Sequence, residues 1–200
     1  SAALVNVTKK QLLMKNDVVS LDLIFGDTPR YNFDYYIDKG FYWSIGINSK
    51  YNLFNYKINP SLFSTAVEFA GTRKVDVSIS DFTNQFFIET LIKKDLSIKV
   101  GLEHKKLIIS SKDNFFNTLL DEDSYVFEDS NFFSLVGGIK FDTFDDKIFP
   151  KNGFLFEGNA QLFFSSLGDN SGFSQFSYLK LNISKAFNAF DNWSFVLGAQ

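Results

Sequence analysis

The sequence has no cysteine, one histidine and three prolines among its 200 residues. Without cysteine there can be no disulfide framework, no thiol nucleophile and no thiolate-bound metal. A single histidine also excludes a histidine-rich metal site. We therefore expect neither a metal site nor a cofactor.

Strong positive charge and long apolar runs are also missing. The net charge is −3, which excludes the basic surface that nucleic-acid-binding proteins use, so we expect no nucleic-acid partner. No apolar run approaches the ~18 residues of a membrane helix, and residues 1–7 do not read as a signal peptide. A chain of this sequence that enters a bilayer would have to do so as strands.

Aromatic residues are abundant: there are 26 Phe, 8 Tyr and 2 Trp. Aromatic and β-branched side chains suit a pleated sheet, and apolar and polar residues alternate along stretches such as Phe41–Asn48 and Leu96–Glu103. Turn sequences such as Asp38-Lys39-Gly40 separate these stretches, and longer polar connections are expected near residues 52–64 and 111–124. The prediction is an all-β fold, an antiparallel up-and-down meander of roughly ten long strands.

The two faces of the expected strands favour a membrane barrel over a soluble sandwich, the alternative that alternation alone leaves open. The apolar face is rich in Phe and Trp, and tyrosines gather near strand ends, as in the aromatic girdles of membrane barrels. The opposite face carries charges that a lumen would solvate, namely Asp22, Asp34, Asp76, Lys99, Lys140 and Asp142. The residues expected to face lipid are Phe41, Trp43, Ile45, Ile47, Leu96, Ile98, Val100 and Leu181.

A turn motif spans residues 142–153, where Asp142-Thr143-Phe144-Asp145-Asp146 precedes Phe149-Pro150-Lys151-Asn152-Gly153. Proline presets its own φ, and glycine permits a conformation that other residues resist. We predict a structural hairpin shaped by Asp142, Asp145, Pro150 and Gly153. The acidic residues are interpreted as structural and not as a cation site, because no calcium-loop spacing surrounds them.

Two stretches resemble known families. Lys140–Phe156, with the motif just described, is similar to the Asp…Phe-Pro-x-x-Gly hairpin of the bacterial surface-antigen barrel superfamily, which includes outer-membrane assembly factors and two-partner secretion pores. Leu12–Ser49 resembles the opening of the barrel in patatin-like phospholipases of the Bacteroidetes type; its matching segments are Asn16–Asp22, Gly26–Phe33 and Asp38–Ser44. In those phospholipases a patatin hydrolase domain and a small periplasmic module precede a C-terminal barrel.

The resemblance implies that residues 1–200 form one partial transmembrane β-barrel, truncated at both ends, in the bacterial outer membrane. Its implied partners are the outer-membrane lipid and the upstream hydrolase and periplasmic module of the same parent chain. The Arg-Gly motif of the lumen loop, which follows the hairpin in the superfamily, does not occur before Gln200.

No catalytic motif is present. The Gly-x-Ser-x-Gly pentapeptide of patatin-type hydrolases is missing, and its nearest echo, Trp43-Ser44-Ile45-Gly46, lies within a predicted strand and lacks the first glycine. His104 has no nucleophile partner that a motif identifies, so we expect it at the bilayer interface or in the lumen. This chain is therefore predicted to be no enzyme, but to anchor or display an upstream lipid hydrolase. The alternatives are the barrel of an outer-membrane protein assembly or two-partner secretion pore, and a soluble lipid-binding β-domain.

Overall fold

The structure is a computed structural model that describes residues 2–40, 42–58, 75–111, 125–168, 172–190 and 193–200. Within these ranges, ten strands form one antiparallel sheet in which every strand pairs with its neighbour in sequence. The strands are β1 (Ala3–Lys10), β2 (Asp17–Phe25), β3 (Arg30–Gly40), β4 (Trp43–Ile58), β5 (Val75–Lys93), β6 (Leu96–Ser111), β7 (Tyr125–Asp142), β8 (Gly153–Gly168), β9 (Phe176–Phe190) and β10 (Trp193–Ala199). The predicted all-β meander of ten strands is confirmed. In the described residues there is no helix of the length and apolarity needed to span a membrane.

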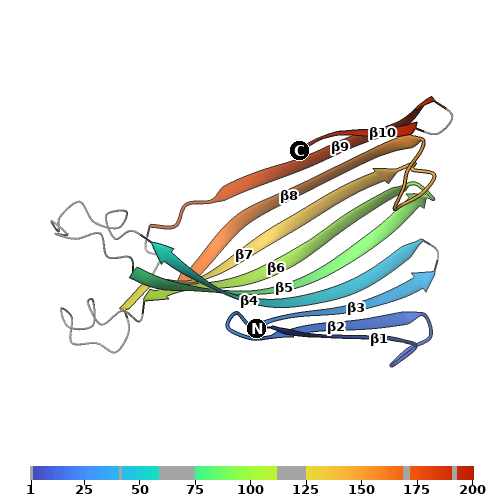
Figure 1. Cartoon of the computed structure of the whole chain (residues 1–200). Coiled ribbons are helices and arrows are strands. Elements are labelled where there is room, and N and C mark those ends of the chain that lie inside the picture. The colour runs from blue at the N-terminus through green and yellow to red at the C-terminus, as the bar shows by residue number, and fades with distance from the viewer. Residues whose placement is uncertain (1, 41, 59–74, 112–124, 169–171, 191–192) are drawn as a thin grey trace.

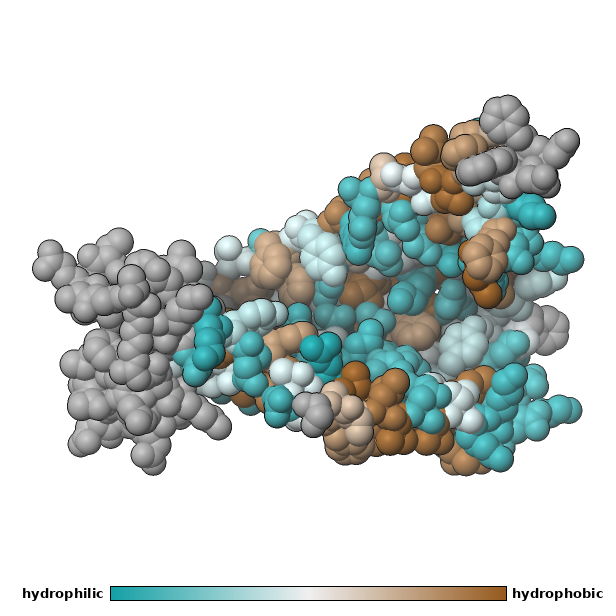
Figure 2. Space-filling model, in the orientation of Figure 1, coloured by the Kyte–Doolittle hydropathy of each residue, from teal (hydrophilic) through white to brown (hydrophobic). Residues whose placement is uncertain are grey.

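The sheet curves into a trough. Figure 1 shows β1–β3 along one side, β8–β10 along the other and the long central strands between them. Hydrophilic residues line much of the hollow in the same view (Figure 2). Because the strands twist and coil in a fixed direction, a sheet of this many strands curves instead of lying flat.

The connections fall into two groups at opposite ends of the sheet. One end, which we call the hairpin end, carries the β1–β2, β3–β4, β5–β6, β7–β8 and β9–β10 turns. The other, the loop end, carries the β2–β3 and β8–β9 connections and the longer β4–β5 and β6–β7 connections; residues 59–74 and 112–124 of the longer two lie outside the described residues. The predicted start of the first long connection at residue 52 was wrong: β4 continues to Ile58, because Asn52–Ile58 pairs with Val75–Asp81 of β5.

Few side chains are buried, because a single sheet has no second layer against which to pack. The buried apolar residues among those described are Val77, Val136, Phe163 and Ala186. Close packing is instead achieved along the inner side of the sheet, where the ring of Phe87 lies against its partner Gly46 on β4. A Cβ on Gly46 would stand 2.2 Å from Cζ of Phe87, so glycine provides the space that the aromatic ring fills.

Candidate functional site

The residues predicted to face lipid lie on one side of the sheet, which we call the outer face. Directly opposed residues of an antiparallel pair point to the same side, and Ile45, Ile88 and Val100 are successive partners across β4, β5 and β6. The same register places the other predicted positions on this face; those that the structure describes are Trp43, Ile47, Leu96, Ile98 and Leu181. Phe41 lies outside the described residues.

The outer face is apolar and uncovered. Trp43, Val100, Leu102 and Leu179 are between 52 and 65 % exposed. Soluble monomers rarely expose a contiguous apolar surface larger than a few hundred Å², whereas the lipid-facing band of a membrane barrel is apolar around its circumference. This face is therefore suited to a partner as apolar as the hydrocarbon of a bilayer.

The apolar band of the outer face ends, toward the loop end, at a polar row. Ser49, Asn84 and His104 are successive partners across β4, β5 and β6. His104 Nε2 lies 3.2 Å from Oδ1 of Asn131, and its ring lies 5.0 Å from the ring of Phe133, centroid to centroid. His104 is thus on the outer face at the edge of the band, away from the hollow.

An aromatic cluster follows one row beyond. Tyr31 contacts both Tyr51 and Phe82, with ring centroids 6.1 and 6.5 Å apart. Rings with a polar tip favour the interface between hydrocarbon and headgroups. At the opposite edge of the band, Trp43 begins β4 on the same face. Along β4, Trp43 therefore lies in the first row of the apolar band, and Tyr51 lies one row beyond the polar boundary at Ser49.

The other side of the sheet, which we call the trough face, is polar. Gln161 is at its centre: its amide donates to Oε1 of Glu103 (2.6 Å) and to Oγ of Ser134 (2.7 Å), and its carbonyl accepts from the hydroxyl of Tyr178 (2.6 Å). Gln85 donates to the second oxygen of Glu103 at 3.2 Å. Ser134 and Gln161 are buried, and buried polar groups of this kind are stable only when their hydrogen bonds are made.

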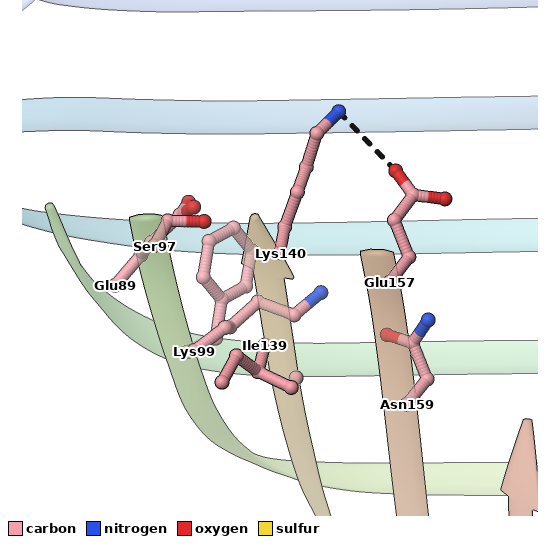
Figure 3. A pocket seen from close by; sticks show the side chains of 9 residues that line it. Glu89, Ser97, Lys99, Ile139, Lys140, Glu157 and Asn159 are labelled. Atoms are coloured by element: carbon pink, nitrogen blue, oxygen red, sulfur yellow. Dashed lines mark ion pairs between the residues drawn. The ribbon is translucent and has the colours of Figure 1, made fainter. Parts of the chain in front are cut away.

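Nearer the hairpin end, charged side chains surround a hollow of about 260 Å³ in the trough face (Figure 3). Lys140 Nζ lies 3.2 Å from Oε1 of Glu157 and 3.5 Å from Oδ2 of Asp142. Lys99 extends over the ring of Phe87, with Nζ 5.0 Å from the centroid, an arrangement in which the ring face attracts the cation. Charged side chains of this kind are stable in contact with water or a polar chain segment, and they would be unstable in contact with lipid.

The serine and the histidine considered as catalytic candidates lie on opposite faces of the sheet. Ser44, the nearest echo of a hydrolase nucleophile, is buried within β4 on the trough face, opposite Asp38 and Glu89, whereas His104 lies on the outer face. Among the described residues there is also no group of three or more His, Cys, Asp or Glu side chains that could hold a metal ion. The chemistry of the site is therefore that of two surfaces, one apolar and one polar.

The β7–β8 turn is held by carboxylates that bind backbone N–H groups. Oδ1 of Asp145 accepts from Lys151 N (2.8 Å) and Asn152 N (3.1 Å). Asp146 does the same for Ile148 N (2.7 Å) and Phe149 N (2.8 Å). Together the two carboxylates accept hydrogen bonds from four backbone N–H groups in the connection between β7 and β8, on both sides of Pro150.

The two other predicted residues of the motif lie at the base of this turn. Asp142 accepts from Phe144 N at 3.2 Å and its own N–H donates to the carbonyl of Asp95 at 2.8 Å, which ties the turn to the β5–β6 hairpin. Gly153 has a φ of +123° and lies against the carbonyl of Thr143. The motif residues thus shape the backbone of the turn.

The turn should respond to acid. Hydrogen bonds from Asn152 and Lys151 lower the pKa of Asp145, and those from Phe149 and Ile148 lower the pKa of Asp146. A carboxylate whose folded-state pKa is depressed stabilises the fold above its unfolded pKa of about 4, and this stabilisation is lost as the pH falls through the folded-state value. We expect the Lys151 and Asn152 amides to lose hydrogen-exchange protection as the pH falls below about 4. In Asp145→Asn this loss should be absent, because the amide does not titrate. If the variant loses protection over the same pH range as the original chain, Asp145 is not the group responsible.

One position of the predicted lumen set is wrong. Asp76 is the partner of Lys57, and both lie on the outer side, in phase with Phe82 and Phe86. The reason is that, toward the loop end, apolar residues of β4 and β5 such as Phe54 and Ile79 lie on the trough side and polar residues lie on the outer side. The sequence did not predict the Gln161 network, because its amide, hydroxyl and carboxylate side chains come from five different strands and no local pattern connects them.

The comparisons with known proteins agree with this geometry. A match to the OMP85 superfamily extends over residues 1–200. The chain belongs to the OMP85 superfamily. Among solved structures, this OMP85 chain is similar to BamA from Haemophilus ducreyi lacking POTRA domains 1–3, with a TM-score of 0.69 and 14 % identity. The likeness covers 98 % of this chain and 37 % of that chain, so this OMP85 chain spans little more than a third of its structural relative. No curated protein matches it.

Membership of the superfamily confirms the coarser prediction, an outer-membrane β-barrel of the OMP85 type, and the BamA structure confirms the fold. The division of the sheet into an apolar outer face and a polar trough face is what such a barrel requires, with lipid on one side and a polar interior on the other.

Proposed function

We propose that this chain forms part of the wall of an outer-membrane barrel and anchors an upstream patatin-like hydrolase, performing no catalysis itself. The observation that supports the membrane role is the uncovered apolar band from Trp43 to Ile47, continued through Val100 on β6, with a hydrogen-bonded polar face behind it. The hydrolase is proposed from the likeness of Leu12–Ser49 to the start of the barrel in patatin-like phospholipases.

Further strands of the parent chain would complete the barrel. In the described residues, β1 and β10 each pair along one edge only, and backbone N–H and C=O groups left unpaired in hydrocarbon cost several kcal/mol each. Closure therefore requires partners for both edges. We propose that segments of the same parent chain supply them. In support, the likeness covers 37 % of the BamA chain, so most of that chain has no counterpart in this sheet.

Cell fractionation of the parent protein tests the anchoring role. We expect esterase activity in the outer-membrane fraction, released only by detergent. A parent lacking the whole barrel, which means residues 1–200 and the strands that complete it, should keep its esterase activity and move to the soluble fraction. Activity that stays with the membrane after this deletion would contradict anchoring by the barrel, and a parent without esterase activity would contradict the hydrolase.

Membership of the OMP85 superfamily is compatible with a second candidate, a barrel that assembles or secretes other proteins, as the likeness of Lys140–Phe156 to the surface-antigen barrels implies. The discriminating measurement is the folding rate of an unfolded outer-membrane protein added to vesicles that contain the parent chain. An anchor should leave this rate unchanged, whereas an assembly factor should raise it. The parent chain with a catalytically inactive hydrolase domain is the matched control, because any effect of lipolysis on the vesicles is then absent.

A further inference from the structure

The polarity of the sheet reverses along its central strands. We infer that the hydrocarbon core of the bilayer ends on the outer face at the row Ser49, Asn84 and His104, and that β4, β5 and β6 continue beyond it as an extramembrane sheet with its apolar side turned inward. This inference rests on the proposed membrane insertion and adds where on the sheet the bilayer stops.

The reversal is visible in two successive rows near the loop end. Phe54, Ile79 and Ile109 are partners across the three strands and lie on the trough side. The next row, on the outer side, is Asn55, Ser78 and Ser110. On the hairpin side of the boundary the arrangement is the opposite, with Ile47, Phe86 and Leu102 outward and Asn48, Gln85 and Glu103 inward.

The backbone does not cause this change. The pairing of β4 with β5 is continuous from Trp43 to Ile58, and that of β5 with β6 is continuous from Val77 to Leu91. Without a bulge, side chains keep alternating between the two faces. The apolar residues themselves change position, so the reversal belongs to the sequence and is shared by three neighbouring strands.

Burial and charge agree with an aqueous surface beyond the boundary. Val77, on the trough side, is 1 % exposed. Its neighbour Asp76, on the outer side, lies 3.8 Å from Lys57, and both side chains are more than 70 % exposed. An exposed ion pair is stable in water, whereas exposed charges facing hydrocarbon are costly.

The rows between the band and the reversed sheet have the mixed character of a membrane interface. Lys106 lies 3.7 Å from Asp129 on the outer side, beside the aromatic cluster of Tyr31, Tyr51 and Phe82. A tilted strand crosses the hydrocarbon in about 9–11 residues. Counted from Leu96, where β6 begins, that length ends between His104 and Lys106.

Site-directed spin labelling of the full parent chain in phosphatidylcholine vesicles tests the boundary. The chain has no cysteine, so Val100→Cys, Ser78→Cys and Asn159→Cys each give one nitroxide site within this chain, in the band, beyond the boundary and in the trough. Oxygen, which concentrates in hydrocarbon, should relax the Val100 label severalfold more than a water-soluble nickel chelate does. The nickel chelate should dominate at Ser78, and Asn159 serves as the reference for a polar site.

The outcomes separate the boundary from membrane insertion itself. If the Ser78 and Val100 labels both favour oxygen, the boundary is wrong although the barrel is inserted. If both favour nickel, the proposed insertion fails, and the inference fails with it. Should Val100→Cys not fold, Ile45→Cys on the same outer row replaces it.

Discussion

Replacing Val100 by arginine is expected to block insertion of the barrel. Val100 is 53 % exposed near the middle of the apolar band, between its partners Ile88 and Gly137. An arginine at the midplane of a membrane barrel costs ~2–4 kcal/mol, and each ~1.4 kcal/mol is a factor of ten in an equilibrium. The folded fraction in vesicles, measured by the heat-dependent shift of the parent chain on a gel, should fall at least tenfold.

The matched control adds the same charge to the other side of the sheet. Asn159 is exposed on the trough face, in the wall of the hollow that contains Lys140 and Glu157. Asn159→Arg should insert as the unchanged chain does, because water or polar groups solvate the charge there. Equal insertion of the Val100 and Asn159 variants would show that the outer face has been assigned wrongly.

Replacing Gly153 by alanine is expected to destabilise the β7–β8 hairpin strongly. The φ of +123° is a region that side-chain-bearing residues avoid, and the new Cβ would stand 2.3 Å from the carbonyl oxygen of Thr143. Backbone strain of this type costs on the order of 1–3 kcal/mol, and the clash with a backbone atom adds to it. Urea unfolding of the parent chain in vesicles should show a lower midpoint.

Gly137→Ala is the control for this substitution. Gly137 lies within β7, and nothing is within 4 Å of the place that its Cβ would take. The two variants thus differ in φ and in available space but not in the atoms added. A similar unfolding midpoint for both would mean that the strained turn does not contribute to stability as described.

The fold could be predicted from the sequence because alternation reports directly on a two-sided sheet. Stretches such as Leu96–Glu103 keep strict alternation, and turn sequences such as Asp38-Lys39-Gly40 and Lys93-Lys94-Asp95 separate neighbouring strands. The end of β4 could not be predicted in the same way. Asn52, Asn55 and Lys57 read as a polar connection, but their polar side chains belong to a strand that has left the apolar environment and pairs with β5.

The reversal of polarity between the two faces can also be recognised in the sequence once the strand pairing is known. In β5 the apolar residues occupy odd positions up to Ile79. From Phe82 onward most of them occupy even positions (Phe82, Phe86, Ile88 and Ile92), with Phe87 and Leu91 as the exceptions. In a single strand, the same change of pattern would also result from a β-bulge, which shifts the following side chains to the other face. Only the continuous register of β4, β5 and β6 shows that the three strands change together.

The trough face was predictable in kind but not in detail. Alternation places Glu103 and Gln161 opposite apolar neighbours, and so on the polar side. Their hydrogen bond joins β6 to β8 across the intervening β7. The stagger of the strands decides which polar side chains meet, and turn lengths alone do not fix that stagger.

The reversed polarity of the central strands has a consequence for how deeply the protein can sit in a membrane. Displacement toward the hairpin end would carry Asn55 and Ser78 into hydrocarbon. Displacement toward the loop end would expose Phe86 and Leu102 to water, so both displacements are opposed. The sheet therefore fixes its own position along the bilayer normal, because displacement is unfavourable in both directions. In a bilayer of different thickness the lipids next to these strands, and not the protein, would have to stretch or compress.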